Sequence, residues 1–372
     1  MAEPGKRRAT IESLAGTLVT PQGTFRGRLR MTASIREIRR DRRAARWPLL
    51  VPGFIDLHVH GGGGFDVMQG EEAVRGVARF HARHGTTALL ATTVTAPREE
   101  LLQAARGIAA AMRDPPPDAA RILGLHLEGP FLSPEALGAQ PPHAIPPDPA
   151  LLEAIAAVVP LRVVTAAPEI DPGQQLAMRA KSLGFRLQIG HTRCSYAQAV
   201  AALDAGWSGF THLFNAMSGL HHREPGAVAA ALARGTWAEI IPDLVHVAPG
   251  ALLAARRALP RLYGVTDATA AAGMPAGSYR LGRHRVQRFE DRVVLPDGTL
   301  AGSVLTMDRA FANLLRLGIE VAEAAGMLAT LPAEYLGLEE RGRLVVGAAA
   351  DLVAIGPDLC IEAVWIEGRR IS

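Results

Sequence analysis

Short apolar runs alternate with segments of helical period along most of the chain, from residue 51 onward. In intervening segments such as EEAVRGVARFHARHG, apolar residues recur at a spacing of three or four, which predicts amphipathic helices. Strands that alternate with helices favour a parallel sheet, and eight such units are typical of a (β/α)8 TIM-like barrel. The eight apolar runs that we predict as strands are 54–60, 87–94, 121–130, 161–169, 186–192, 209–216, 237–243 and 262–268.

The two ends of the chain have a different pattern. Residues 12–50 and the C-terminal stretch GRLVVGAAADLVAIGPDLCIEAVWIEGRRIS alternate apolar and polar residues between glycine turns, as half-buried strands do. We therefore expect the two ends, residues 1–50 plus 343–372, to pair into a small β-sandwich domain. The barrel domain is expected over residues 51–342.

Composition and the lack of targeting signals indicate where in the cell this α/β protein is expected. The chain has 372 residues, of which 48% are hydrophobic and 20% charged, as in ordinary globular proteins. The start, MAEPGKRRATIESLAG, lacks the apolar core of a signal peptide, and no apolar run approaches the roughly 18 residues of a membrane span. With only Cys194 and Cys360, which form no C-x-x-C pair, we expect a cytoplasmic protein without a membrane partner.

The charge pattern argues against a nucleic-acid partner. The pI is about 9.5, but the net charge is only +4. Arginine supplies nearly all the basic residues and titrates higher than lysine, so the pI overstates the positive field. The clusters at 36–46 and 280–288 are interrupted by acidic or apolar residues and lack interleaved aromatics, which favours a solvated surface.

Polar side chains follow several predicted strands, at the point where each strand ends. His58 and His60 close the first run, and residues two apart on a strand face the same side. The carboxyl ends of barrel strands meet at one face, where the active sites of barrel enzymes lie. The other strand-end residues of this kind are Glu128, His191, His212 and Asp267.

Each of these residues also has an ordinary structural explanation. A histidine can be satisfied by backbone, Glu128 can cap a loop, and Asp267 can be a helix N-cap. Six such coincidences on one barrel face are less expected than a divalent metal site, with zinc as the default ion and iron as the alternative. The glycines after His60 let the next loop pass close to that site. His126 shares a strand face with Glu128, and we expect it to be structural.

This donor set indicates hydrolysis of an amide. A metal with nitrogen and carboxylate ligands lowers the pKa of bound water to about 7, which provides a nucleophile at neutral pH. Asp267 would take the proton of that water and later give it to the leaving amine. Serine or cysteine catalysis is disfavoured because the chain has no G-x-S-x-G elbow and Cys194 is more simply a packed thiol.

Several sequence motifs resemble those of one protein family. They are PGFIDLHVHGGGGFD, GTTALLATTVT, LGLHLEGPFLSP, IGHT, THLFNAMSGLHHREPG, VTDAT and DGTLAGSVLTMDRA, which run from residue 52 to about residue 310. Together they resemble the N-acetylglucosamine-6-phosphate deacetylase family of the amidohydrolase superfamily. HLEGPF, THLFNAM and REPG carry most of this likeness, and the GAAADLVAI tail fits the superfamily's small β domain.

The resemblance implies roles for individual residues. Glu128, His191 and His212 would bind the main metal, His58 and His60 a second one, so that each subunit holds one or two ions. Asp267 would be the catalytic acid and base. Substrate contacts would come from Ala139, Gln140, Asn215, Ala216, Arg223, His246, Leu300, Ala301 and Gly302.

The resemblance also implies a substrate and a partner. The substrate would be N-acetylglucosamine 6-phosphate, which would give glucosamine 6-phosphate and acetate. Arg223 would bind the phosphate, since a guanidinium makes bidentate bonds to phosphate. The family often forms homodimers in which neighbouring subunits help to bind the phosphate.

Two departures leave the exact substrate open. The family usually has histidine where Gln140 stands, and glycine where Leu244 stands, and we expect leucine there to crowd the ligand. One alternative is another amide on the same metal site, such as N-acetylgalactosamine 6-phosphate or an N-acyl amino acid. Another is a barrel that has lost catalysis and binds a sugar or a partner, against which the intact ligand set argues.

Overall fold

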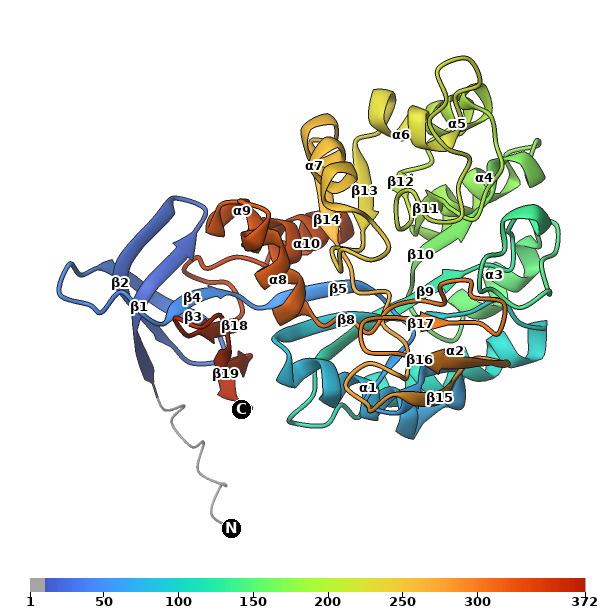
Figure 1. Cartoon of the computed structure of the whole chain (residues 1–372). Coiled ribbons are helices and arrows are strands. Elements are labelled where there is room, and N and C mark those ends of the chain that lie inside the picture. Colours follow the sequence, from blue (N-terminus) through green and yellow to red (C-terminus); the bar gives the residue numbers. More distant parts are fainter. Residues whose placement is uncertain (1–10, 372) are drawn as a thin grey trace, which may run out of the picture.

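The fold joins a parallel barrel to a mixed sheet made by both ends of the chain (Figure 1). We describe a computed structural model of the chain, and the described residues are 11–371. Residues 1–10 and 372, which belong to the predicted small domain, lie outside the described residues.

The barrel sheet has eight strands in the order β14-β13-β12-β11-β10-β9-β8-β5, and neighbours pair in parallel. The prediction of a TIM-like barrel is therefore confirmed. The ring closes through backbone bonds between β5 and the segment after β14: Asp267 N donates to His58 O over 2.9 Å, and His60 N donates to Ala268 O over 2.9 Å. The strands are β5 (Phe54–Val59), β8 (Thr86–Thr93), β9 (Arg121–Glu128), β10 (Leu161–Ala166), β11 (Arg186–Ile189), β12 (Gly209–Phe210), β13 (Trp237–Ile240) and β14 (Arg261–Gly264).

Amphipathic helices follow these strands and cover the barrel (Figure 1). Helix α8 shows the pattern, because Met307, Ala310, Phe311 and Leu314 recur at helical spacing and are buried. The helices are α1 (Glu71–Arg83), α2 (Arg98–Arg113), α3 (Pro149–Ala156), α4 (Gln175–Leu183), α5 (Tyr196–Asp204), α6 (Ala227–Arg234), α7 (Pro249–Ala258), α8 (Met307–Arg316), α9 (Val321–Ala325) and α10 (Leu331–Leu336), with the short turns η1 (Val67–Gln69), η2 (Pro134–Ala136), η3 (Pro168–Ile170) and η4 (Gly326–Thr330).

The second sheet contains strands from both chain ends, as predicted, in the order β20-β19-β18-β4-β1-β2-β3. Strand β4 pairs in parallel with β1 and antiparallel with β18, and Gly53 then leads the chain directly into the barrel. Because β4 crosses residues 50 and 51, the division of the chain at that point stays a prediction. The strands are β1 (Glu12–Thr20), β2 (Gly23–Met31), β3 (Ile35–Arg40), β4 (Leu49–Pro52), β18 (Leu352–Ile355), β19 (Ile361–Ile366) and β20 (Arg369–Arg370).

An antiparallel insertion, which we did not predict, follows the last barrel strand. It consists of β15 (Gly277–Leu281), β16 (His284–Arg288) and β17 (Val293–Val294). Its apolar residues Leu281, Val286 and Val293 form a small buried cluster with Val94 and Ala301. The arginine-rich stretch 280–288 is thus a hairpin with one buried face. A further short pair, β6 (Gly61–Gly62) and β7 (Phe65–Asp66), lies just after β5.

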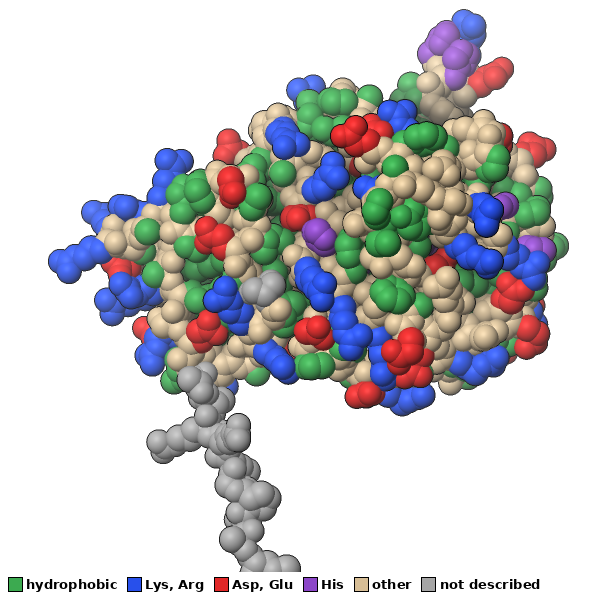
Figure 2. Space-filling model, turned by 60° about the horizontal axis from the view of Figure 1, so that its bottom comes forward, with side chains coloured by type: hydrophobic (Ala, Val, Ile, Leu, Met, Phe, Trp, Pro, Cys, Tyr) green, Lys and Arg blue, Asp and Glu red, His purple; other side chains and the backbone are tan. Residues whose placement is uncertain are grey.

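The surface agrees with a solvated distribution of arginine. In Figure 2 basic side chains gather at the end of the molecule where Figure 1 shows the small sheet. Acidic residues pair with some of them, since Arg28 lies 2.7 Å from Asp41 and Arg30 lies 3.2 Å from Glu37. Between residues 11 and 371, no helix combines the length and the apolar character that crossing a membrane requires.

Candidate metal centre

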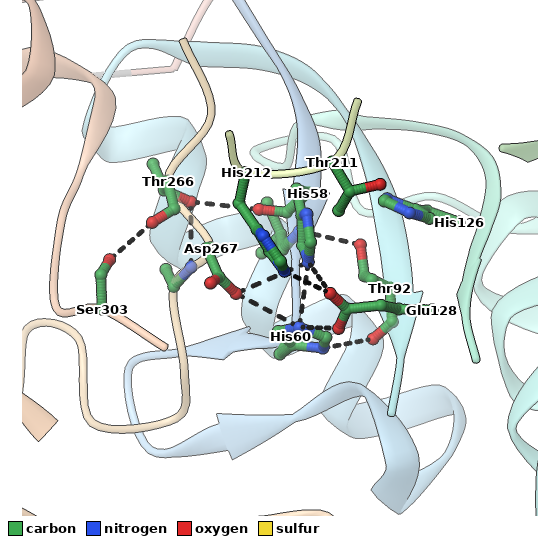
Figure 3. A network of polar contacts seen from close by, with 12 residues as sticks. His58, His60, Thr92, His126, Glu128, Thr211, His212, Thr266, Asp267 and Ser303 are labelled. Carbon is green, nitrogen blue, oxygen red and sulfur yellow. Dashed lines mark hydrogen bonds and ion pairs between the residues drawn. The ribbon is translucent and has the colours of Figure 1, made fainter. Parts of the chain in front are cut away.

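The strand ends bring the six predicted side chains together, and Figure 3 labels His58, His60, Glu128, His212 and Asp267 among them. They lie at the carboxyl ends of their strands, beside a pocket of about 310 Å³. Each of these residues is more than nine-tenths buried. The pocket lining includes His60, Glu128, His191, His212 and Asp267, with His58 directly behind them.

The six residues form two groups that could each hold a metal ion. The first is His58, His60 and Asp267, and the second is Glu128, His191 and His212. Within each group the candidate ligand atoms lie within 4.8 Å of one another. The structure therefore places the histidine pair of the first strand and the predicted main site next to each other.

Glu128 lies between the two groups. Its Oε1 is 3.1 Å from His191 Nε2 and 3.0 Å from His212 Nε2. Its Oε2 is 3.1 Å from His60 Nε2. One carboxylate can thus contact ions at both positions.

The donor set fits a divalent cation. His60 and His191 donate from Nδ1 to the backbone oxygens of Thr92 and Ala136 over 3.1 and 2.9 Å, which directs Nε2 of each ring toward the centre, where it can bind a metal. His60 Nε2 lies 3.1 Å from His58 Nε2, and His191 Nε2 lies 3.0 Å from His212 Nε2. Carboxylate oxygens of Glu128 and Asp267 converge on the same nitrogens, and a cation placed among them would be bonded by several donors at once. Imidazole nitrogen with carboxylate oxygen suits zinc and iron.

The ionisation of the site follows from its burial and its close charges. Burial raises the pKa of Glu128, but the imidazoles of His58, His191 and His212 outweigh this and hold it well below its usual range. Burial likewise raises the pKa of Asp267, yet the neighbouring histidines bring it down to about 2. Both carboxyls are therefore ionised at neutral pH and are available as ligand and base.

Unusual backbone conformations aim these side chains into the pocket. His191, His212 and Asp267 have φ of 47°, 29° and 50°, in the left-handed region that residues other than glycine rarely adopt. Such strain clusters at functional sites, where surrounding bonds hold it in place. For Asp267 these bonds include a 2.7 Å bond from Ser303 N to its carbonyl oxygen. Gly61 has no space for a Cβ, which would lie 2.4 Å from Phe65 O and 2.5 Å from Ala270 N, so the loop after His60 packs closely against the segment that follows Asp267.

Most of the predicted substrate contacts line the same pocket. They are Ala139, Gln140, Asn215, Ala216, His246, Leu300 and Gly302. His246 is held by Asp243, whose Oδ2 lies 2.7 Å from His246 Nδ1. Gln140 accepts a 2.7 Å bond from Thr95 N and donates to Glu128, so it contacts a predicted metal ligand directly.

Three other predicted residues lie elsewhere. Arg223 is exposed on the loop between β12 and α6, where its Nη1 is 2.9 Å from His222 Nε2. Ala301 is fully buried against the insertion. Leu244 does not belong to the pocket lining and packs against the hydrophobic core, and the expected crowding of the ligand stays a prediction. Its φ of 67° gives the physical reason for glycine at this position, since glycine adopts this conformation freely.

Sequence reasoning missed two charged residues of the site. Arg193 lines the pocket, with its Nε donating to Glu135 O over 3.2 Å. Glu239 is fully buried on β13 and lies 3.0 Å from His58 Nδ1. The only sequence signal for Glu239 was an acidic residue inside the apolar run WAEII.

His126 is bonded to Leu57 O and Thr165 Oγ1, which agrees with the structural role that we expected.

Related proteins cover almost the whole chain. The model of the amidohydrolase family matches residues 49–371. The N-acetylgalactosamine-6-phosphate deacetylase of Escherichia coli O157:H7 is 40% identical over 332 residues, which cover 87% of this chain and 88% of that protein. The N-acetylglucosamine-6-phosphate deacetylase of Vibrio furnissii is 37% identical over 332 residues, which cover 87% of this chain and 82% of that protein.

Solved structures give the same picture. The N-acetylglucosamine-6-phosphate deacetylase of Thermotoga maritima superposes with a TM-score of 0.91 at 30% identity, covering 97% of this chain and 99% of that one. A mutant of the Mycobacterium smegmatis deacetylase, in complex with N-acetyl-D-glucosamine-6-phosphate, superposes with a TM-score of 0.90 at 33% identity. It covers 97% of this chain and 99% of that one.

Proposed function

Because this chain belongs to the amidohydrolase family, and within it to the deacetylases of N-acetyl amino-sugar 6-phosphates, we propose that its substrate is N-acetylglucosamine 6-phosphate and its products are glucosamine 6-phosphate and acetate. The observation that carries this proposal is the shared pocket. Most of the metal donors, an ionised aspartate and most of the residues expected to face the sugar line one cavity of about 310 Å³. This volume suits a small ligand.

Asp267 is the acid and base of the proposed reaction. A divalent metal, when bound by the two groups of ligands, supplies an activated water and polarises the acyl oxygen. Asp267 takes a proton at its carboxylate and passes it to the nitrogen of the leaving amine. The carboxylate is suited to this task because it lies at the pocket, 3.3 Å from His60 and 3.5 Å from His58, and is ionised.

The phosphate has two candidate partners in the chain. Arg193 lines the pocket and offers a guanidinium from the same subunit. Arg223 lies on a fully exposed stretch, residues 219–225, and is not part of the pocket lining. We propose that the protein is a homodimer in which this loop brings Arg223 to the pocket of the partner subunit. Bidentate contacts from arginine are the usual means of holding a phosphate.

N-acetylgalactosamine 6-phosphate is the second candidate substrate. Two observations favour it: the 40% identity to a deacetylase of that sugar, and Gln140, which stands where the family usually has histidine. Gln140 lines the pocket and bonds to Glu128, so a change of residue there alters both the ligand shell and the sugar site. The two sugars differ only in the configuration at C4.

The test is acetate release by zinc-loaded protein. The substrates are the two N-acetyl amino-sugar 6-phosphates and unphosphorylated N-acetylglucosamine, with Asp267→Asn as the inactive control. A higher kcat/KM for N-acetylglucosamine 6-phosphate supports the first proposal, and a higher value for the galactosamine compound supports the second. Turnover of neither phosphate would contradict both and direct attention to N-acyl amino acids.

A further inference from the structure

The geometry points to Glu239 as a positioning residue that holds one ligand of each metal position and thereby sets the metal affinity of the centre. Glu239 lies in β13, which contributes neither a predicted metal ligand nor the predicted acid and base. It contacts the centre from inside the barrel, on the side away from the pocket, since it is not among the pocket-lining residues. This inference rests on the proposed metal site.

The first contact fixes His58. Glu239 Oε2 lies 3.0 Å from His58 Nδ1, and neither side chain is exposed to solvent. A carboxylate can only accept here, so His58 carries its proton on Nδ1 and presents Nε2 as a lone pair to the metal position. Figure 3 shows His58 at the centre of the polar network, between Glu128, Asp267 and His60.

The second contact fixes the backbone of His212. The same Oε2 accepts a bond of 3.2 Å from His212 N. The backbone of Glu239 adds a bond, because its carbonyl accepts from Leu213 N over 2.9 Å. His212 has a φ of 29°, so its strained backbone needs such support. One carboxylate thus joins ligands of the two metal groups.

Glu239 differs from the partners of the other metal histidines. His60 and His191 donate from Nδ1 to neutral backbone carbonyls, whereas His58 donates to a carboxylate. A charged acceptor makes the stronger hydrogen bond and raises the basicity of the ring more. We therefore expect the position that contains His58 to depend most on Glu239.

A third metal ion is the alternative explanation for this contact. His58, His126 and Glu239 also lie close enough to hold one. Both ring nitrogens of His126 are already bonded, at 2.9 Å to Leu57 O and 2.8 Å to Thr165 Oγ1. Since Leu57 O can only accept and Thr165 Oγ1 lies within bonding distance of the other nitrogen, His126 is satisfied without a metal. The hydrogen-bonded arrangement explains the contacts without a further ion.

The test compares zinc binding by the metal-stripped full-length protein and its Glu239→Gln variant. Zinc content is measured after dialysis, and affinity by competition with a chromophoric chelator. Loss of an outer partner of a metal ligand typically weakens metal affinity about 10- to 100-fold. We expect zinc affinity to fall by this factor at the position that contains His58 and to change only a few fold at the other position.

Tyr263→Phe is the matched control. The Tyr263 hydroxyl bonds to the other oxygen of Glu239 over 3.3 Å, so this variant alters the same carboxylate without touching the bond to His58. It is expected to keep wild-type zinc affinity. The KM for sugar phosphate is expected to stay unchanged in Glu239→Gln at saturating zinc, because the side chain does not face the pocket.

The outcomes separate this inference from the function it rests on. Equal zinc affinity of wild type and Glu239→Gln at both positions would overturn the role of Glu239 and leave the metal site intact. A wild-type protein that binds no zinc would instead contradict the metal site itself. If the Glu239→Gln variant does not fold, the protonation of His58 can still be tested by NMR on the wild-type protein. Histidine ¹H–¹⁵N spectra of the zinc-loaded protein must show a protonated Nδ1 for His58, and a protonated Nε2 would overturn the inference.

Discussion

At the scale of single residues, burial and charge decide what each side chain of the site can do. Asp267 and Glu128 are both buried carboxyls surrounded by histidine, and both are held in the ionised form. They differ in position. Glu128 is enclosed by imidazoles on both sides, whereas the carboxylate of Asp267 lies beside His58 and His60 and lines the pocket. The enclosed carboxylate suits a ligand and the other a proton carrier.

Asp267→Asn tests this division. The amide cannot accept and return a proton, so kcat for acetate release is expected to fall about 10²- to 10⁴-fold, the usual contribution of a general acid and base. Zinc content measured alongside kcat is the control, because Glu128 and the histidines remain. A variant that retains most of the wild-type kcat would show that another group moves the proton.

Arg193→Ala tests the phosphate contact within the subunit. A charge-assisted hydrogen bond contributes about 1.5 kcal/mol or more, so KM for the sugar phosphate is expected to rise about tenfold with kcat nearly unchanged. Unphosphorylated N-acetylglucosamine is the control substrate, and its kcat/KM should not change. An equal loss for both sugars would mean that Arg193 supports the pocket and does not bind the phosphate.

Residues at the ends of predicted strands could be assigned to the site from the sequence. Residues that reach the site only through contacts between distant strands could not. His58, His60 and Glu128 follow from their place at strand ends, because all barrel strands deliver their carboxyl ends to one face. Glu239 occupies the middle of an apolar run, and its contact with His58 spans 181 residues of sequence. Nothing in local spacing encodes such a pair.

At the scale of elements, periodicity predicted the barrel strands and the end-to-end sheet, but not the insertion β15–β17. In that insertion, buried Leu281 and Val286 alternate with arginines, and the density of charge hid the strand pattern. Buried polar groups within elements were equally hidden. His81 on α1 is one of them: its Nε2 bonds to Gly61 O over 2.9 Å, beside the strand pair β6 and β7.

His81 is expected to make the fold sensitive to acid. Burial lowers the pKa of this imidazole from 6.5 to about 4, so the folded state resists protonation while the unfolded chain accepts it. Stability is complete above pH 6.5 and falls as the pH drops from 6.5 toward 4, by about 3 kcal/mol from this group alone.

The variant His81→Gln isolates this effect. Glutamine can still donate to Gly61 O but does not titrate, so its unfolding free energy should lose less between pH 6.5 and 4. Urea unfolding of wild type and variant across this range measures the difference. Parallel curves for the two proteins would contradict the prediction.

At the scale of the whole molecule, the metal centre ties together strands that are distant in sequence. β5, β9, β11, β12 and β14 each lead into a candidate ligand or the acid, so an ion bound there would add bonds between strands across the barrel. Two pairs of imidazole nitrogens from different segments converge there at 3.0 and 3.1 Å, and an ion would bond to both members of a pair. We therefore expect a bound metal to contribute to the stability of the barrel as well as to its chemistry.

Removal of the metal should accordingly lower the melting temperature. A ligand at 100 times its Kd stabilises the folded state by about 2.7 kcal/mol, and chelation removes this contribution. Differential scanning calorimetry before and after dialysis against a chelator measures it, and added zinc should restore the transition. An unchanged melting temperature, in a protein shown to have lost its zinc, would indicate that the apo barrel is already fully ordered.

The proposed homodimer predicts that two inactive variants restore activity to each other when their subunits are mixed. If Arg223 acts in the partner's pocket, Arg223→Ala and Asp267→Asn damage different sites of a mixed dimer. One site then has both defects and the other has neither. Random exchange of the two variants at equal amounts should restore about a quarter of the wild-type sites, because half of the dimers are mixed and each has one intact site. Acetate release at low substrate, measured before and after subunit exchange, checks this. If Arg223 instead serves its own pocket, each site of a mixed dimer carries one defect, and mixing restores nothing.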